Sequence, residues 1–359
     1  MTIEEKNLLL IIPNDEIGGA QNFFKRLFKN IAYEKKMLYV EDLKSFGALN
    51  ILHRVWSIYK NIKRLGAGGE VTILATVNSI VPSALCKFLF TKFFLVSRLG
   101  NTLSSEIKNQ GIKSHKVILI HKVVFYLSNL VVFQSNSMKK DALRVLKLKD
   151  SRKFIVINNG IDFKEVSLKS NQKNLLEINK DYFNFILLGS FKYQKAYDIF
   201  LEAVCLIPSD KINRMRFYIC GDNAYGENVF EEFKRGLEEN NLNKFISLMG
   251  WQDNPYPLIK EMDAYILPSR YEGFPNSLIE ALSLGLPSIV ARCPGANEEI
   301  ILKGMNGLTF ENENASDLRN QIIMMQENYS SFNSLGIIED IKERYHIDKI
   351  ADQYVEALK

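Results

Sequence analysis

Two glutamates, Glu272 and Glu280, flank a turn that interrupts an apolar part of the chain. The stretch SRYEGFPNSLIEALSLGLP runs from Ser269 to Pro287. A turn between a strand and a helix needs a glycine and a capping residue, but it needs neither acid. Because a carboxylate accepts several hydrogen bonds, two acids beside such a turn are suited to binding hydroxyl groups.

The same stretch predicts an exposed helix N-terminus. AYILPS (264–269) is typical of a buried strand, residues 271–275 form the turn, and Asn276 is a good N-cap for the helix SLIEALSL. The backbone N–H groups of residues 276–278 would then lie beyond the carboxyl end of the strand. A phosphate group is the ligand that this arrangement favours.

The two acids lie on either side of this predicted phosphate position. Glu280 lies about one helical turn further on and would accept hydrogen bonds from both hydroxyls of a ribose. Glu272, in the turn itself, would reach a sugar hydroxyl on the far side of the phosphates. The alternatives are a helix-dipole contribution of ~0.3–1 kcal/mol from Glu280 and simple solvation of Glu272.

A second candidate anion site lies at the end of an earlier predicted strand. In LLGSFKYQKAYDIFLEAV (187–204) the strand ends at Gly189 and Ser190, and Lys192 and Lys195 follow before a helix. A loop lysine can meet a diphosphate as a compact point charge, although most loop lysines taken singly are only solvated.

The first helix is preceded by Gly18 and Gly19, where backbone N–H groups can approach an anion closely. An ordinary tight turn accounts equally well for this pair. The first strand-loop lacks G-x-G-x-x-G, which argues against a dinucleotide fold.

The elements that position these residues alternate between short apolar strands and helices. Such runs indicate parallel strands buried on both faces, and ligands of parallel sheets bind beyond the carboxyl ends of the strands. The sequence therefore predicts an α/β protein with two doubly wound domains facing a cleft, joined by a polar linker near 163–180. The predicted strands are 8–13, 37–40, 71–76, 93–98, 130–135 and 154–160, then 183–190, 216–222, 245–250, 264–269, 287–293 and 307–310.

Length and composition agree with two soluble domains, because 359 residues exceed one ordinary core and 47% are hydrophobic. We expect no membrane-spanning segment and no signal peptide. Four scattered cysteines without a C-x-x-C pair predict reduced, buried thiols and a cytosolic protein. They are Cys86, Cys205, Cys220 and Cys293.

The two halves of the chain differ in charge. Residues 1–170 contain 27 basic and 13 acidic residues, a net of +14, and the remainder has a net charge of −9. A basic half is suited to nucleic acid, to an anionic membrane surface or to a phosphorylated substrate. The aromatic–basic patterns of nucleic-acid modules do not stand out, so no nucleic acid is expected. A solvated lysine-rich surface is the remaining alternative.

The second half resembles the donor domain of the retaining GT-B glycosyltransferases of family four. The family pattern P-S-x-x-E-G-F-P-x-x-x-x-E-A-x-x-x-G-x-P matches residues 268–287 and includes its E-x7-E motif. The resemblance extends over most of the chain. The further matching segments are GGAQ, NNGID, GSFKYQKAYD, CGDN and PGANEEII. The last segment aligns Glu299 with the acidic position of the family pattern.

The resemblance implies a nucleotide-diphosphate sugar donor, with UDP-sugar favoured, bound by the C-terminal domain. By this resemblance Lys195 would bind the diphosphate, Glu280 would bind the ribose and Glu272 would bind the transferred sugar. The remaining residues of the implied donor site are Gly18, Gly19, Ser190, Trp251, Gly273, Phe274, Pro275 and Asn276. The implied domains are 1–165 for the acceptor and 180–340 for the donor, with a helix at 341–359 that crosses back to the first domain.

Three positions depart from the family pattern. Ser190 replaces the arginine that usually follows Gly189, and Ala196 replaces a glycine. The family's N-domain histidine has no clear match, and Arg98 or Asn101 lies near its place. We assign Arg98, with Glu272 and Lys195, to the catalytic set.

The chain has no D-x-D, so neither a metal nor a cofactor is expected, and lysine and helix N–H groups would stabilise the leaving charge. We expect a hexosyl or N-acetylhexosaminyl transferase of the retaining type, with a saccharide or lipid-linked acceptor. It would build lipopolysaccharide, capsule or glycolipid at the cytoplasmic face of the cell membrane, held by its basic N-terminal domain. The alternatives are a nucleotide-sugar epimerase and a catalytically silent GT-B-like binding protein.

Overall fold

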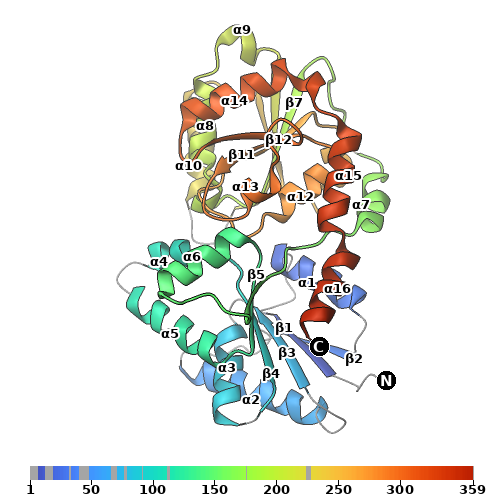
Figure 1. Cartoon of the computed structure of the whole chain (residues 1–359). Helices are drawn as coiled ribbons and strands as arrows, with labels where there is room; N and C mark the ends of the chain where they lie inside the picture. The colour runs from blue at the N-terminus through green and yellow to red at the C-terminus, as the bar shows by residue number, and fades with distance from the viewer. Residues whose placement is uncertain are drawn as a thin grey trace. The chain divides into compact units, whose positions relative to one another are not determined.

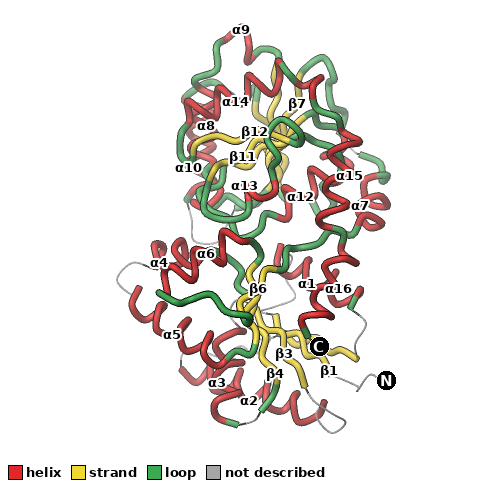
Figure 2. Tube along the Cα trace, viewed as in Figure 1, coloured by secondary structure: helices red, strands yellow, loops and turns green. Residues whose placement is uncertain are grey.

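The chain forms two compact units, each built on one parallel β-sheet (Figure 1). The computed structural model describes residues 7–12, 19–31, 34–39, 48–65, 71–76, 79–90, 92–110, 114–174, 176–223 and 228–358. One unit comprises Met1–Gly160 together with Ile347–Lys359, and the other comprises Ile161–His346. Helices and strands alternate in both units (Figure 2).

The N-terminal unit contains a six-stranded sheet of order β2-β1-β3-β4-β5-β6. Each neighbouring pair is parallel, and Leu9 of β1 lies opposite Ile73 of β3. The strands are β1 Asn7–Ile12, β2 Glu34–Tyr39, β3 Val71–Thr76, β4 Phe94–Arg98, β5 Leu130–Phe133 and β6 Phe154–Val156.

Helices cover both faces of this sheet, which is why its strands are apolar on both sides. One core holds Val55, Ala84 and Phe125, from α2, α3 and α5, and the opposite core holds Phe23 and Tyr354, from α1 and α16. The helices are α1 Gly19–Asn30, α2 Ala48–Leu65, α3 Ile80–Leu89, α4 Leu103–Gln110, α5 Ser114–Leu127, α6 Asn136–Leu146 and α16 Ile347–Ala357.

The C-terminal unit contains a second six-stranded parallel sheet, of order β12-β11-β10-β7-β8-β9. Phe185 of β7 lies opposite Phe217 of β8, and their rings stack with centroids 5.1 Å apart. The strands are β7 Phe183–Leu188, β8 Met215–Cys220, β9 Ile246–Gly250, β10 Ala264–Leu267, β11 Ser288–Arg292 and β12 Gly307–Glu311.

This sheet is also covered on both faces (Figure 1). Phe200, Phe233 and Leu318 cover one face from α8, α10 and α14, and Leu282 and Ile341 cover the other from α12 and α15. The helices are α7 Phe163–Ser170, α8 Tyr197–Cys205, α9 Ser209–Ile212, α10 Val229–Glu239, α11 Tyr256–Lys260, α12 Asn276–Ser283, α13 Asn297–Ile300, α14 Ala315–Glu327 and α15 Ser334–Tyr345.

The predicted strands are all present, with ends that differ by a few residues, and the predicted doubly wound α/β fold is confirmed. The linker prediction for 163–180 needs correction, because α7 lies in that segment and packs on α11 and α12 through Val166. The chain instead passes between the units at 160–161 and 346–347. Among the described residues, no helix is long and apolar enough to cross a bilayer.

Candidate active site

An ion pair between Lys195 and Glu272 lies at the carboxyl edge of the C-terminal sheet. Lys195 Nζ is 2.7 Å from Glu272 Oε1, and the two side chains are 19% and 8% exposed. Lys195 follows β7 and Glu272 follows β10, and these two strands are hydrogen-bonded neighbours. The fold therefore joins two sequence motifs, predicted separately as anion-binding and sugar-binding, into one charged site.

Gly189 allows the lysine side chain to cross the end of β7. Its φ is +147°, and a Cβ atom at this position would lie 3.1 Å from Lys195 Cε. The Gly189 carbonyl accepts a 2.6 Å hydrogen bond from the Tyr197 hydroxyl, and a Cβ on Gly221 would come within 1.9 Å of the same oxygen. Two glycines are thus required here for close packing, and the predicted site residue Ser190 follows directly.

The backbone of Glu272 is fixed by the loop that follows β11. Glu272 N–H donates to the Pro294 carbonyl at 2.9 Å, and Ala296 N–H donates to the Gly273 carbonyl at 3.2 Å. Between these bonds lies Gly295, with φ +132°, where a Cβ would come within 1.9 Å of the Glu272 carbonyl oxygen. Only glycine fits this position, so Gly295 determines how closely the loop approaches Glu272.

Arg270 connects the lysine loop to the glutamate turn. Its guanidinium donates to the Tyr193 carbonyl, at 2.7 Å, and to the carboxylates of Asp198 and Glu313. Its backbone N–H donates to the Gln194 carbonyl at 2.8 Å. Burial opposes the charge, but the hydrogen bonds and charges of Asp198, Glu313 and Tyr193 together outweigh it, so the pKa of Arg270 is raised. Arg270 is therefore a positioning residue for the Lys195–Glu272 pair.

Gln194 adds a second connection between the same two loops. Its amide Nε2 donates to the Tyr271 carbonyl at 2.9 Å and lies 3.4 Å from Glu272 Oε2. Glu272 is consequently held by Lys195 on one carboxylate oxygen and approached by Gln194 on the other.

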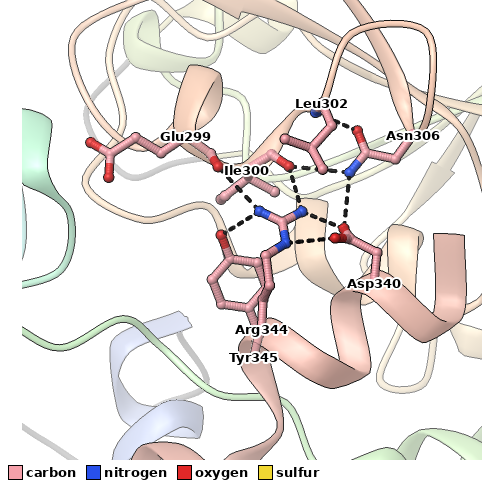
Figure 3. Close-up of polar contacts among 7 residues, drawn as sticks. All are labelled: Glu299, Ile300, Leu302, Asn306, Asp340, Arg344 and Tyr345. Atoms are coloured by element: carbon pink, nitrogen blue, oxygen red, sulfur yellow. Dashed lines mark hydrogen bonds and ion pairs between the residues drawn. The ribbon is translucent and has the colours of Figure 1, made fainter.

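Glu299 occupies α13, and Figure 3 shows how this short helix is anchored. Arg344 of α15 donates to the carbonyls of Glu299, at 3.2 Å, and Ile300, at 2.9 Å, while Asp340 pairs with the same guanidinium. The Glu299 carboxylate points away from Arg344 (Figure 3). The last carbonyls of α13 are thus capped by a cation, which stabilises the segment directly after Gly295.

The helix that carries Glu280 begins one residue earlier than predicted. Pro275 occupies the N-cap position of α12 without a side-chain cap, and Asn276 is the first helical residue. Ser277 in the first turn hydrogen-bonds the buried Tyr265 hydroxyl at 2.8 Å, and Glu280 lies on the next turn, half-buried. Asn276 is therefore not the cap, because the preceding proline already supplies the extended backbone.

The other predicted donor-site residues of the C-terminal unit follow strands of the same sheet, but the two predicted glycines of the N-terminal unit do not belong to it. Gly273 and the buried Phe274 follow Glu272 in the turn, and the Phe274 ring packs edge-on against Tyr345, 5.5 Å away. Trp251 follows β9, two strands from β7, and is 46% exposed, with its indole N–H donating to Asp253 at 2.9 Å. Gly19 is the first residue of α1 in the other unit, and Gly18 lies outside the described residues.

The structure encloses Arg98 within the N-terminal unit, and its assignment to the catalytic set stays a prediction. Arg98 is 0% exposed, and its guanidinium lies 4.6 Å from the Phe23 ring and 5.0 Å from the Phe24 ring. It donates to the Tyr354 hydroxyl at 3.0 Å and to Asn159 Oδ1, and burial lowers its pKa. As the last residue of β4, Arg98 points under α1 and α16, so it stabilises the core of the N-terminal unit.

Nucleophilic cysteine chemistry is disfavoured at this site. Cys293 precedes Pro294, and burial, with the charge of Glu272, raises the pKa of its thiol. Burial also raises the pKa of Cys220, to about 12. The four cysteines are free, but Cys205 is exposed, so the prediction of four buried thiols fails there because Cys205 ends α8 at the surface. Within the described residues, no group of three His, Cys, Asp or Glu side chains could hold a metal ion.

Sequence reasoning missed Arg270, Gln194 and Gly295. Arg270 lies inside the quoted motif, two residues before Glu272, but its partners are 43 to 77 residues away in the sequence. Gln194 directly precedes the predicted Lys195. Gly295 was visible only as a turn glycine, since the close approach that requires it depends on the packing of two loops.

Two parallel-sheet units with charged loops at a carboxyl sheet edge define the GT-B class of proteins. The fold comparisons agree: Anabaena HepE in complex with UDP and glucose matches with a TM-score of 0.81 and 18% identity, over 98% of this chain and 99% of that one. The lipopolysaccharide outer core galactosyltransferase WaaB, in its apo form, matches with a TM-score of 0.74 and 16% identity, over 99% and 100% of the two chains.

Residues 183–328 match the family model described as glycosyl transferases group 1, so the resemblance predicted from the sequence is confirmed for most of the C-terminal unit. An uncharacterized glycosyltransferase of Methanocaldococcus jannaschii is 29% identical over 283 residues, 76% of this chain and 68% of the relative. The Escherichia coli UDP-Gal:alpha-D-GlcNAc-diphosphoundecaprenol alpha-1,3-galactosyltransferase is 28% identical over 217 residues, 58% of this chain and 55% of that enzyme.

Proposed function

We propose that this enzyme transfers a hexosyl or N-acetylhexosaminyl group from a UDP-sugar to a lipid-linked saccharide, with retention of anomeric configuration and without a metal ion. The observation that carries the proposal is the Lys195–Glu272 pair at the ends of β7 and β10, beside the N-terminus of α12. The names of similar proteins include UDP and, in one case, a lipid-diphosphate acceptor, which supports this choice of donor and acceptor.

The donor diphosphate would bind between the Lys195 ammonium and the first N–H groups of α12. Both groups carry positive charge or partial charge, and both stabilise the charge that develops on the leaving phosphate. Glu280, one turn into α12, would accept the ribose hydroxyls. Trp251, half-exposed after β9, would lie beside the base.

Glu272 would contact the transferred sugar, and its present partner suggests how donor binding prepares it. A diphosphate competes with the Glu272 carboxylate for Lys195 Nζ, which is 2.7 Å away in this structure. Binding of the donor would therefore weaken the hold of Lys195 on Glu272 and leave that carboxylate to accept a hydrogen bond from a sugar hydroxyl. Same-face attack by the acceptor, assisted by the leaving phosphate, would retain the configuration.

The biological setting that we propose is synthesis of a surface polysaccharide or glycolipid at the cytoplasmic face of the cell membrane. The N-terminal unit would bind the acceptor there. The net charge of +14 over residues 1–170 supports a role beside anionic lipid.

A thermal-shift screen with UDP-, GDP- and ADP-sugars tests the donor assignment, followed by a transfer assay with a lipid-diphosphate saccharide. We expect UDP-sugars to raise the Tm and the product to require the acceptor. Conversion of the donor without acceptor would establish an epimerase instead, and donor binding without any product would establish a silent binding protein.

A further inference from the structure

Helix α5 exposes an apolar side to solvent. Leu119, Ile120, Val123 and Tyr126 are 63%, 43%, 47% and 83% exposed, while Val117, Val124 and Phe125 on the opposite side are buried in the core. An ordinary surface helix has charged residues on its outer side. Helix α10 of the other unit follows that rule, because its exposed residues are Glu231, Glu232, Arg235, Glu238 and Glu239.

The C-terminal end of α3 extends this apolar side. Phe88 is 70% exposed near the end of α3, and α3 packs beside α5 (Figure 1), whereas the Phe90 ring packs against Tyr59 of α2 with ring centroids 5.2 Å apart. Lys87 donates to Asn129 Oδ1, in the turn between α5 and β5, so the end of α3 lies at the end of α5. We call Phe88, Leu119, Ile120, Val123 and Tyr126 the α3–α5 surface.

The charged residues of α5 itself are all basic, and Glu106 of the neighbouring helix α4 lies 3.8 Å from His121 of α5. Helix α5 contains Lys116 and Lys122, both exposed, together with His115, and it contains no acidic residue. Lys153 donates to the carbonyl oxygens at the end of α5, including that of Phe125 at 2.5 Å. Apolar side chains bordered by lysines match the boundary between acyl chains and anionic headgroups.

We infer that the α3–α5 surface docks on an anionic lipid bilayer, with Tyr126 and its apolar neighbours in the headgroup region and Lys116 and Lys122 against lipid phosphates. The inference deepens the proposed function, on which it rests, by naming the surface that brings the enzyme to a lipid-linked acceptor. A helix that lies on the membrane requires no spanning segment, because its backbone is already hydrogen-bonded and one side stays in water.

Co-sedimentation of the full chain with lipid vesicles tests the inference. Wild type should bind vesicles of equimolar phosphatidylcholine and phosphatidylglycerol and should dissociate from them at high salt. It should bind vesicles of pure phosphatidylcholine only weakly. The variant Lys116→Gln/Lys122→Gln should bind the anionic vesicles roughly fivefold more weakly for each lysine. The variant Leu119→Gln/Val123→Gln should bind at least about tenfold more weakly, because it removes buried apolar contact.

Leu168→Gln/Leu335→Gln is the matched control, since both leucines are exposed at 74% and 72% but belong to the C-terminal unit. This control should bind vesicles like wild type, and the variants and the control should keep the wild-type Tm. Equal binding to both lipid compositions, or unchanged binding by either α5 variant, would overturn the inference. A dimer in sedimentation velocity that is lost in the leucine–valine variant, without vesicle binding by wild type, would also overturn it and assign the surface to a second copy.

The donor assay separates this inference from the proposed function. The α5 variants should keep the Tm increase with UDP-sugar, because the residues lie in the other unit from Lys195 and Glu272. Vesicle binding without any UDP-sugar effect would contradict the proposed function while leaving the α3–α5 surface supported.

Discussion

At the carboxyl edge of the C-terminal sheet, Lys195 and Glu272 pair while keeping contact with solvent, whereas at the carboxyl edge of the N-terminal sheet Arg98 is enclosed by aromatic rings. Arg98 is the last residue of β4, and Lys195 lies in the loop that follows β7. Lys195 has a carboxylate 2.7 Å away, but Arg98 has the Tyr354 hydroxyl, Asn159 and two phenylalanine rings. The carboxyl edge of a parallel sheet therefore holds a candidate site in one unit and a core residue in the other.

The difference comes from what lies over each strand end. Loops that contain Gly189 and Gly295 lie at the ends of β7 and β10, and the side chain of Lys195 there remains 19% exposed. Over β4 lie α1 and the C-terminal helix α16, whose Tyr354 comes from 256 residues away in the sequence. A charged residue at the carboxyl end of a parallel strand thus indicates a site only when a helix does not cover it.

Replacing Glu272 tests the open edge and should have the largest effect. Glu272→Gln keeps the shape and can still accept a hydrogen bond from Lys195, so the fold should persist. We expect kcat to fall by about 10³-fold because the charge that contacts the transferred sugar is lost. Glu261→Gln, which removes an exposed ion pair with Lys180 in the same unit, should leave kcat unchanged. Wild-type kcat in Glu272→Gln would refute the catalytic role.

Replacing Arg98 tests the closed edge. Arg98→Ala should lower the free energy of unfolding by about 3 kcal/mol, because it leaves a cavity and unpaired polar groups in the core. Tyr354→Phe should cost about 1–3 kcal/mol, since it removes the acceptor of a buried guanidinium hydrogen bond. Urea unfolding measures both, with the exposed Tyr126→Phe as control. Unchanged stability of Arg98→Ala combined with lost transfer would instead support the catalytic assignment of Arg98.

Gly295 tests whether loop packing holds Glu272 in place. Gly295→Ala would place a Cβ within 1.9 Å of the Glu272 carbonyl, so the turn must move; we expect kcat to fall roughly 10- to 100-fold and stability to fall by about 2 kcal/mol. Gly304→Ala is the matched control: its φ is also positive, at +80°, but no atom lies within 4 Å of its added Cβ. It should cost about 1 kcal/mol of stability and leave kcat unchanged. Equal kcat values for the two variants would show that the loop does not position Glu272.

The sequence was sufficient to predict the strands and to single out Lys195 and Glu272 at the open edge, because both depend on local pattern. Strands buried on two faces are continuous apolar runs, and the Lys195 and Glu272 motifs each lie within a few residues of a strand end. The environment of Arg98 could not be predicted, since it depends on which distant helix packs over β4. Helix α7 was missed for a related reason: its residues are polar, and Val166 becomes a core residue only by contact with the rest of the C-terminal unit.

Arg270 gives the smallest and most specific test, because it belongs to the open edge without reaching into the proposed ligand position. Arg270→Lys keeps one positive charge but loses the planar group that joins Asp198, Glu313 and the Tyr193 carbonyl. We expect kcat to fall about tenfold with KM nearly unchanged, because Lys195 and Glu272 are then held less firmly in position. The free energy of unfolding should fall by about 1 kcal/mol. Arg216→Lys, whose guanidinium covers the Tyr182 ring at 3.4 Å in the same unit, is a control for loss of an arginine contact and should keep the wild-type kcat. A rise in KM at constant kcat would instead make Arg270 a ligand of the donor, and the open edge would then contain a third charge that binds substrate.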